Sequence, residues 1–226
     1  LLIVSYNVRQ NIAHAIDAII KSHLDDFQII IIDNNSNDGT KAILSKIQDP
    51  RVKILYREKN NGKGANIKNA LTKATGDLIV FQDGDLEYSP KDYKKLIGPI
   101  VSGKADVVYG SRFLGGGDDA HRVLYFKHKL ANSFLTFLSN LFTDINLTDM
   151  ETGYKAFTFD SVKDIELKEN RFGFEPEITA KMARKKLRFY EVGISYYGRT
   201  YEEGKKIGLK DAFRALYCII RYNLFS

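Results

Sequence analysis

The sequence is poor in cysteine. Cys218 is the only cysteine among 226 residues, which excludes an intramolecular disulfide and a metal site built from several thiolates. The fold must therefore depend on an apolar core, and a composition of 44% hydrophobic and 27% charged residues is that of an ordinary globular protein. Low cysteine usage is also typical of a reducing compartment, so we expect a cytoplasmic location.

Long apolar runs are also missing. The densest run, residues 29–32, has the length of a strand and falls far short of the ~18 residues that a membrane-spanning helix needs. The chain opens in an apolar segment without a basic region or an initiator methionine, so we expect no signal peptide. Any membrane contact is expected to be peripheral, on the cytoplasmic face.

Acidic residues are scarce at the C-terminal end. Residues 181–226 carry eleven Lys and Arg against four acidic residues, a local charge of +7 in a chain whose net charge is +6. Such a basic end favours an anionic partner, for example a phosphate, a lipid surface or a nucleic acid. Residues 209–224 have apolar side chains at helical spacing, so this basic helix either lies at a lipid interface or docks onto the protein.

Short β-branched segments alternate with stretches of helical periodicity, a pattern typical of α/β layering. We expect a mostly parallel central sheet flanked by helices and joined by right-handed crossovers. No repeat, linker or second domain is evident, which predicts one domain over residues 1–226. The expected strands are residues 1–5, 28–33, 53–56, 77–82, 106–109, 154–159 and 188–196, and the expected later helices are residues 125–141, 177–186 and 209–224.

Polar, turn-forming segments follow the first four expected strands. In an open parallel sheet, ligands bind outside the carboxyl ends of the strands. One edge of the sheet is therefore expected to collect residues 6–7, 33–40, 60–64 and 83–87.

The acidic turn at residues 83–87 is the strongest local signal. Its carboxylates, at alternate positions, repel one another and are tolerated where a hard divalent cation binds, because Mg²⁺ and Mn²⁺ prefer oxygen ligands. Gly84 lets a ligand approach the backbone closely. We expect Asp83, Asp85 and Glu87 to hold Mg²⁺ or Mn²⁺, and a solvated acidic turn that caps the next helix is the simpler alternative.

A second signal is the carboxylate at the end of the second expected strand. Asp33 can accept hydrogen bonds from a nucleobase N–H or a ribose hydroxyl, and residues 38–40 form the turn into the next helix. Taken alone, this segment is equally an ordinary Asx-rich turn.

Six segments occur in the order found in inverting family 2 glycosyltransferases. The sequence most resembles the polyprenyl-phosphate sugar transferases, namely the dolichol-phosphate mannose and glucose synthases and their bacterial relatives. The likeness covers nearly the whole chain and implies a GT-A-type fold. The segments are residues 4–7, 33–40, 61–65, 74–77, 83–90 and 110–112.

The resemblance implies a nucleotide-sugar-binding half in residues 1–110 and an acceptor-binding half, with the basic C-terminal helix, in residues 111–226. Three positions depart from the family pattern: Ser5 replaces a usual Pro, Val8 replaces a usual Glu, and Asn34 stands where a second Asp is common. The donor-site residues that the resemblance implies are Tyr6, Asn7, Asp33, Lys63, Asp83, Gly84 and Asp85.

The acceptor side is expected to need cations rather than a strong base, because a lipid phosphate is already an anionic nucleophile. Arg offers a planar fork for phosphate and Lys a point charge. Residues 148–155 are similar to the family's acceptor-loop segment, and this resemblance implies Asp149 and Lys155 as site residues. Asp149 would act either as a base or as a group that orients a cation. The expected acceptor-phosphate residues are Arg112, Lys155, Arg199, Lys205 and Lys206, and the expected catalytic residues are Asp85, Arg112 and Asp149.

The implied reaction is a metal-dependent, inverting transfer of a hexose from a UDP- or GDP-sugar to a polyprenyl or dolichyl phosphate. Three alternatives stay open: a soluble glycan or protein acceptor, a sugar-phosphate nucleotidyltransferase, and a non-catalytic anion-binding protein. A Gly-rich basic signature after the first strand, typical of nucleotidyltransferases, is missing. No nucleic-acid partner is expected, because the cations lack the frame of a nucleic-acid-binding motif.

Overall fold

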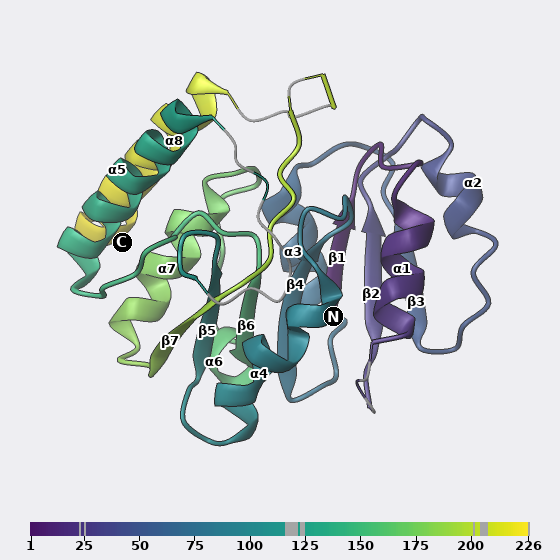
Figure 1. The fold of residues 1–226 in the computed structure, drawn as a ribbon, viewed down its shortest axis with the longest axis horizontal. Helices are drawn as coiled ribbons and strands as arrows, with labels where there is room; N and C mark the ends of the chain where they lie inside the picture. Colours follow the sequence, from purple (N-terminus) through teal and green to yellow (C-terminus); the bar gives the residue numbers. More distant parts are fainter. Residues whose placement is uncertain are drawn as a thin grey trace.

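The computed structural model describes residues 1–22, 24, 26–115, 122, 125–200, 202–203 and 208–225. Within these ranges, one seven-stranded sheet has the order β3-β2-β1-β4-β6-β5-β7 (Figure 1). All strands run parallel except β6, which is antiparallel to both of its neighbours. The strands are β1 (Leu2–Ser5), β2 (Ile29–Asp33), β3 (Val52–Tyr56), β4 (Leu78–Asp83), β5 (Val107–Ser111), β6 (Lys155–Thr158) and β7 (Phe189–Gly193).

Helices cover both faces of the sheet, so that strand residues are apolar on both sides. In β2, Ile30 and Ile32 pack in the layer that contains α3 and α7, whereas Ile29 and Ile31 pack in the layer that contains α1 and α4. The helices are α1 (Ile12–Ile20), α2 (Thr40–Leu44), α3 (Lys63–Leu71), the short 3₁₀ turn η1 (Pro90–Asp92), α4 (Tyr93–Val101), α5 (Phe126–Thr143), α6 (Phe159–Val162), α7 (Phe174–Arg184) and α8 (Leu209–Leu224).

The mostly parallel α/β sheet predicted from the sequence is confirmed, and each expected strand is present with small shifts at its ends. The helix expected at residues 177–186 begins earlier, at Phe174. Pro176 lies in its first turn, where a residue without an N–H leaves no helical hydrogen bond unmade.

The antiparallel strand β6 decides what lies at the edge of the sheet. Its first residue, Lys155, pairs with Phe81 of β4 and with Tyr109 of β5. Because β6 runs the opposite way, the segment that precedes it, residues 148–154, lies at the same edge as the carboxyl ends of the parallel strands.

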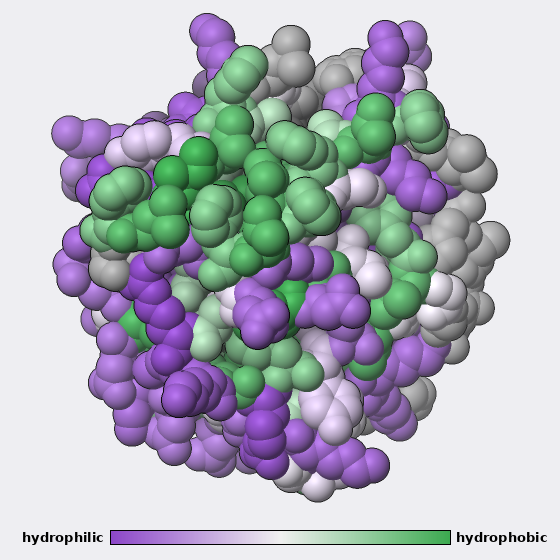
Figure 2. Space-filling model, turned by 90° about the vertical axis from the view of Figure 1, so that its left-hand side faces the viewer, coloured by the Kyte–Doolittle hydropathy of each residue, from purple (hydrophilic) through white to green (hydrophobic). Residues whose placement is uncertain are grey.

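Helices α5 and α8 lie side by side at one end of the molecule, beside α7 (Figure 1). Helix α8 therefore docks onto other helices rather than directly onto the sheet. The face to which this pair belongs carries a broad patch of apolar side chains (Figure 2). Across the described ranges, none of the helices combines the length and the hydropathy that a bilayer crossing requires.

Candidate active site

Asn7 ties the loops after β1 and β2 together. It adopts a left-handed conformation with φ of 52°. Its backbone N–H donates to Ser36 Oγ at 3.0 Å, and its side-chain oxygen accepts from the N–H of Asn37 at 3.0 Å. Tyr6, half-buried, precedes it in the same loop. These two bonds hold Asn7 in place at the edge of the sheet. The family resemblance implies Tyr6 and Asn7 as residues that bind the nucleotide-sugar donor.

Asp33, at the end of β2, is fully buried. One carboxylate oxygen, Oδ2, accepts the N–H of Ser36 at 3.0 Å. The other, Oδ1, has no hydrogen-bond partner within the described residues. A buried carboxylate oxygen without a donor is costly, so this atom is well suited to accept a hydrogen bond from a ligand.

Asn34, which stands where the family often has a second acidic residue, holds the next loop. Its amide nitrogen donates to Asn60 Oδ1 at 2.8 Å, and its amide oxygen accepts from the N–H of Asn61 at 2.9 Å. A carboxylate could accept the second bond but could not donate the first. Asn34 therefore orders the turn that leads into α3.

The acidic turn after β4 is paired with two cations. Lys63, at the start of α3, lies 3.0 Å from Asp83 Oδ1. Arg199 reaches Asp85 Oδ2 at 2.5 Å and Glu87 Oε1 at 3.0 Å. Arg199, expected at the acceptor phosphate, thus lies against the acidic turn. Lys205 and Lys206 lie outside the described residues.

The pKa of the Asp85 carboxyl is raised in this turn. Burial raises the pKa of Asp85, and the neighbouring Asp83 and Glu87 carboxylates raise it further, to about 7, although Arg199 opposes the rise. The three carboxylates of the turn thus face two cations, Lys63 and Arg199.

The carboxylates of Asp83, Asp85 and Glu87 do not surround one point, because Lys63 and Arg199 draw them in different directions. Across the described ranges, no group of three or more His, Cys, Asp and Glu side chains is arranged to hold a metal ion. A hard divalent cation needs only one or two carboxylates when phosphate and water supply its other ligands. The carboxylate oxygens of Asp83, Asp85 and Glu87 are the type of ligand that such an ion prefers.

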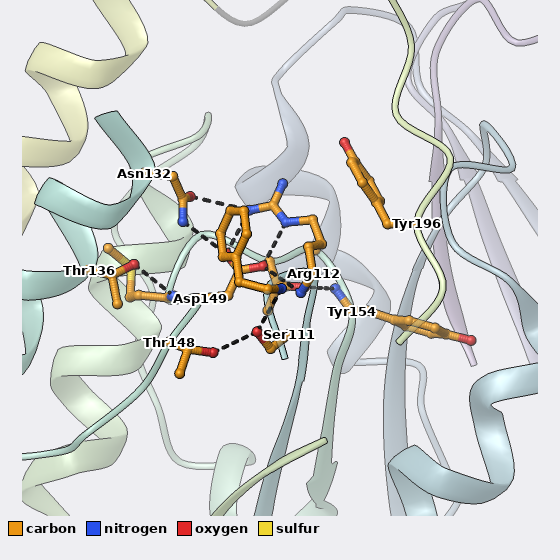
Figure 3. A network of polar contacts seen from close by, with 12 residues as sticks. Ser111, Arg112, Asn132, Thr136, Thr148, Asp149, Tyr154 and Tyr196 are labelled. Atoms are coloured by element: carbon orange, nitrogen blue, oxygen red, sulfur yellow. Dashed lines mark hydrogen bonds and ion pairs between the residues drawn. The ribbon is translucent and has the colours of Figure 1, made fainter. Parts of the chain in front are cut away.

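Arg112 and Asp149, which the sequence analysis expects on the acceptor side, form the centre of a polar network (Figure 3). Arg112 follows β5 and grips Asp149 with two parallel bonds, from Nε to Oδ2 at 2.6 Å and from a terminal nitrogen to Oδ1 at 2.7 Å. Asn132 of α5 donates to Asp149 Oδ1 at 3.1 Å and accepts from Arg112 at 3.2 Å. These bonds use three of the five guanidinium N–H groups and hold the guanidinium of Arg112 in place.

This geometry distinguishes between the two roles expected for Asp149. Burial raises the pKa of Asp149, but the Arg112 guanidinium outweighs burial and holds the pKa below its ordinary value. Both oxygens already accept hydrogen bonds, including the backbone N–H of Arg112 at 3.0 Å. A carboxylate in this state is a weak base, and its contacts are those of a group that orients Arg112.

Tyr196 links the acceptor side to the acidic turn. Its ring centroid lies 5.2 Å from the Arg112 guanidinium carbon, and its hydroxyl donates to Glu87 Oε2 at 3.1 Å. The cation of Arg112 and the acidic turn are thus separated by a single aromatic side chain.

Lys155, the first residue of β6, packs against the residues that precede it, 150–152. Its ammonium is fully buried and donates to the carbonyls of Met150 and Thr152. The ring centroid of Tyr109 lies 4.5 Å from its nitrogen. Lys155 is expected at the acceptor phosphate. In the structure its buried ammonium binds backbone carbonyls of residues 150–152 instead.

A buried acidic pair under the site was not anticipated from the sequence. Glu175 Oε1 lies 3.0 Å from Lys63 Nζ, so Glu175 and Asp83 share this cation. Glu175 Oε2 and Glu151 Oε1 are buried without a hydrogen-bond partner in the described part of the chain. Burial and the charge of Glu175 raise the pKa of Glu151 to about 8, which favours a proton on Glu151 near neutral pH.

The chain resembles known proteins in both sequence and fold. Residues 1–166 match the profile described as "Glycosyl transferase family 2". The chain belongs to family 2 of the glycosyltransferases. It is similar to an undecaprenyl-phosphate mannosyltransferase from Micrococcus luteus, with 28% identity over 189 residues, 80% of this chain and 76% of that protein. A dolichol-phosphate mannosyltransferase from Pyrococcus furiosus is 26% identical over 226 residues, 98% of this chain and 63% of that protein.

A solved structure shares the fold of this glycosyltransferase. Glucosyl-3-phosphoglycerate synthase from Mycobacterium tuberculosis, in complex with Mn²⁺, UDP and phosphoglyceric acid, superposes with a TM-score of 0.74 at 18% identity. The match covers 100% of this chain and 78% of that one. The expected GT-A-type fold is thereby confirmed. The family match confirms the expectation of a sugar-transferring enzyme.

In this glycosyltransferase, Gly153, in the segment before β6, packs closely against the Asp83–Lys63 pair. A Cβ at this position would overlap Asp83 Oδ2 and would lie 3.1 Å from Lys63 Nζ. We expect Gly153→Ala to displace the Asp83–Lys63 pair and to reduce sugar transfer by about tenfold to a hundredfold. Initial rates and thermal unfolding of the purified variant measure this effect.

Gly98 provides the matched control, because a Cβ there meets nothing within 4 Å. Gly98→Ala, in α4, is expected to keep full activity and to raise stability by up to about 1 kcal/mol. Wild-type rates for Gly153→Ala would contradict the close approach at this contact.

Proposed function

We propose that this glycosyltransferase moves a hexose from a UDP- or GDP-sugar to a polyprenyl phosphate, with inversion at the anomeric carbon and with Mg²⁺ or Mn²⁺. Residues 1–110 would hold the donor and residues 111–226 the acceptor. The observation that carries the proposal is the position of Arg112, a cation that Asp149 and Asn132 hold in place one tyrosine ring away from the acidic turn.

The donor half offers contacts for each part of a sugar nucleotide. Asp33 Oδ1, buried and unpartnered within the described residues, would accept a hydrogen bond from the base or the ribose. Lys63, between Asp83 and Glu175, would give positive charge near the diphosphate. Tyr6 and Asn7 lie in the adjoining loop, which Ser36 holds in place.

The acidic turn would provide the metal ligands. Asp85, with Asp83 and Glu87 beside it, would hold Mg²⁺ or Mn²⁺ when Arg199 releases its carboxylates. A bound divalent ion would supply charge neutralisation on the departing nucleoside diphosphate. Support comes from the oxygen-only donor set and from the Mn²⁺ and UDP in the structural neighbour.

The acceptor half would position an anionic nucleophile. Arg112 presents its remaining N–H groups from a guanidinium that Asp149 and Asn132 hold rigid. A phosphate oxygen held there needs no base, because it is already deprotonated, so Asp149 serves as the group that orients Arg112. Positioning of two anions by fixed cations would supply much of the rate enhancement. Support for a lipid acceptor comes from the two lipid-phosphate mannosyltransferases to which the chain is similar.

The test is a transfer assay with purified protein. UDP- and GDP-sugars are offered with a short-chain polyprenyl phosphate and Mn²⁺ or Mg²⁺. We expect a sugar-phosphoryl lipid and free nucleoside diphosphate from one nucleotide class. EDTA should abolish turnover, and added Mn²⁺ or Mg²⁺ should restore it.

Other products would overturn defined parts of the proposal. Transfer to phosphoglycerate or another soluble acceptor alone would remove the lipid acceptor and leave the donor site standing. Undiminished turnover in EDTA would remove the metal from the acidic turn.

A further inference from the structure

Glu191 of β7 accepts hydrogen bonds from the loop that carries Asp149. It pairs with Tyr109 of β5 in the sheet, and its side chain is half-buried. One carboxylate oxygen, Oε1, accepts the N–H of Asp149 at 3.1 Å, and the backbone nitrogen of Thr148 lies 3.0 Å from both oxygens. The other oxygen, Oε2, also accepts the hydroxyl of Thr148 at 2.9 Å. Glu191 therefore holds the backbone at the residue whose carboxylate orients Arg112.

Ser111, the last residue of β5, extends these contacts to the loop after that strand. It is fully buried, and its hydroxyl oxygen accepts the N–H of Phe113 at 3.1 Å and the N–H of Leu114 at 3.2 Å. The same oxygen lies 2.6 Å from the hydroxyl oxygen of Thr148 (Figure 3). A hydroxyl has two acceptor lone pairs and one proton. Since both lone pairs of Ser111 are engaged, its proton points at Thr148, and the Thr148 proton points at Glu191.

The direction of these bonds requires an ionised carboxylate at their end. We call Ser111, Thr148 and Glu191 the Glu191 relay. Each hydrogen bond of the relay points toward Glu191, as does the N–H of Asp149. A carboxylate only accepts hydrogen bonds, whereas an amide of the same shape also donates. An amide nitrogen in place of either oxygen would therefore face an N–H or O–H group that itself donates.

We propose that Glu191 is a positioning residue for the acceptor phosphate. It acts on Arg112 from two sides. Asp149 accepts the backbone N–H of Arg112 and two of its guanidinium N–H groups, and Ser111 accepts the N–H groups of the two residues that follow Arg112. The inference rests on the proposed function, in which Arg112 binds the phosphate of the acceptor.

Charge alone would give Glu191 the opposite effect. Burial raises the pKa of Glu191 and the negative charge of Asp149 raises it further, although the hydrogen bonds from Thr148 and Asp149 oppose the rise. Glu191 thus adds a second carboxylate beside the one that already neutralises Arg112. If its charge were decisive, a neutral residue at this position would bind a phosphate more tightly. The sign of the change in acceptor KM therefore separates positioning from charge.

Glu191→Gln tests the inference through steady-state kinetics with a short-chain polyprenyl phosphate. We expect the acceptor KM to rise by about tenfold, because one or two hydrogen bonds of the relay are lost and Arg112 is less well placed. The donor KM should stay within about twofold of the wild-type value. An unchanged or lower acceptor KM would overturn the inference, and so would equal rises in both KM values.

Thr148→Val tests whether Thr148 and Glu191 act through one relay. The conflict in Glu191→Gln arises at the Thr148 hydroxyl, so the combined variant should raise the acceptor KM no further than Glu191→Gln alone. Thr148→Ser keeps the hydroxyl and should restore the wild-type acceptor KM. Losses that multiply in the combined variant would overturn the relay.

Asp106→Asn is the matched control. Asp106 lies at the opposite edge of the sheet, where it accepts the backbone N–H of Arg188 at 2.9 Å and its Nε–H at 3.0 Å, and so joins the same two strands. Asp106→Asn should lower the thermal midpoint by a few degrees and leave both KM values unchanged. A rise in acceptor KM equal to that of Glu191→Gln would reduce Glu191 to a general structural role and overturn the inference.

The guanidinium of Arg112 supplies a readout that needs no sugar transfer. Its Nε–H donates to Asp149 Oδ2 at 2.6 Å, so this proton should exchange slowly with solvent in NMR spectra. We expect exchange at least about tenfold faster in Glu191→Gln and unchanged in Asp106→Asn. Equal exchange in Glu191→Gln and the wild type would overturn the inference while sugar transfer stands. Faster exchange in this variant, with a wild type that transfers nothing to a polyprenyl phosphate, would overturn the proposed function and leave the action of Glu191 on Arg112 intact.

Discussion

Asp85→Asn is expected to reduce sugar transfer by at least about 10³-fold. Asp85 lies between Asp83 and Glu87 in the acidic turn, where burial and these two neighbours raise its pKa to about 7. An amide of the same shape keeps the oxygen but removes the charge that would bind a divalent cation. Initial rates at saturating donor, measured across Mg²⁺ or Mn²⁺ concentrations, give the size of the loss and show whether more metal recovers it.

The fold should tolerate this change. Asp85 is repelled by its two acidic neighbours, so its neutral replacement relieves repulsion, while Glu87 still pairs with Arg199 at 3.0 Å. The thermal midpoint of Asp85→Asn should therefore equal or exceed that of the wild type. Turnover at the wild-type rate would remove Asp85 from the mechanism, and a large drop in the midpoint would assign it a structural role.

Arg112→Met is expected to lower both activity and stability. Asp149 is fully buried, and removal of its bidentate partner leaves an uncompensated charge, which costs about 3–5 kcal/mol of unfolding free energy. Transfer should fall by at least about 10²-fold, because the fixed cation for the acceptor phosphate is lost. Chemical denaturation and initial rates measure the two effects separately.

A double variant separates the two effects of Arg112→Met. Arg112→Met combined with Asp149→Asn removes the buried charge, and Asn132 can still bond to the amide, so most of the lost stability should return. Activity should stay low, since the phosphate-binding cation is still missing. If activity returned together with stability, Arg112 would be a purely structural residue.

The sequence predicted the sheet well because its strands carry local signals. Runs such as residues 29–32 are apolar on both faces, which is what a buried parallel strand requires. It did not predict that β6 runs antiparallel between β4 and β5. Pairing partners and direction depend on contacts between residues far apart in the chain, which leave no periodic signal in residues 155–158.

The candidate site shows the same limit. Asp33 and the acidic turn were predicted because each ends a strand in a carboxylate. Glu175 was missed because an acidic residue beside a proline at the start of a helix is what any helix favours there. Asn132 was missed because a polar residue in an amphipathic helix is usually taken to face solvent, whereas α5 has the reverse orientation.

Strand β6 connects the two strands that carry the acidic turn and Arg112. It is hydrogen-bonded to β4, which ends in the acidic turn, and to β5, which ends beside Arg112. Neighbouring strands lie about 4.8 Å apart, so the distance between the acidic turn and Arg112 is set by the hydrogen bonds of one sheet. Under the proposed function, this distance would be the separation of donor and acceptor, and a new acceptor preference would arise by exchanging surface segments while the sheet stays the same.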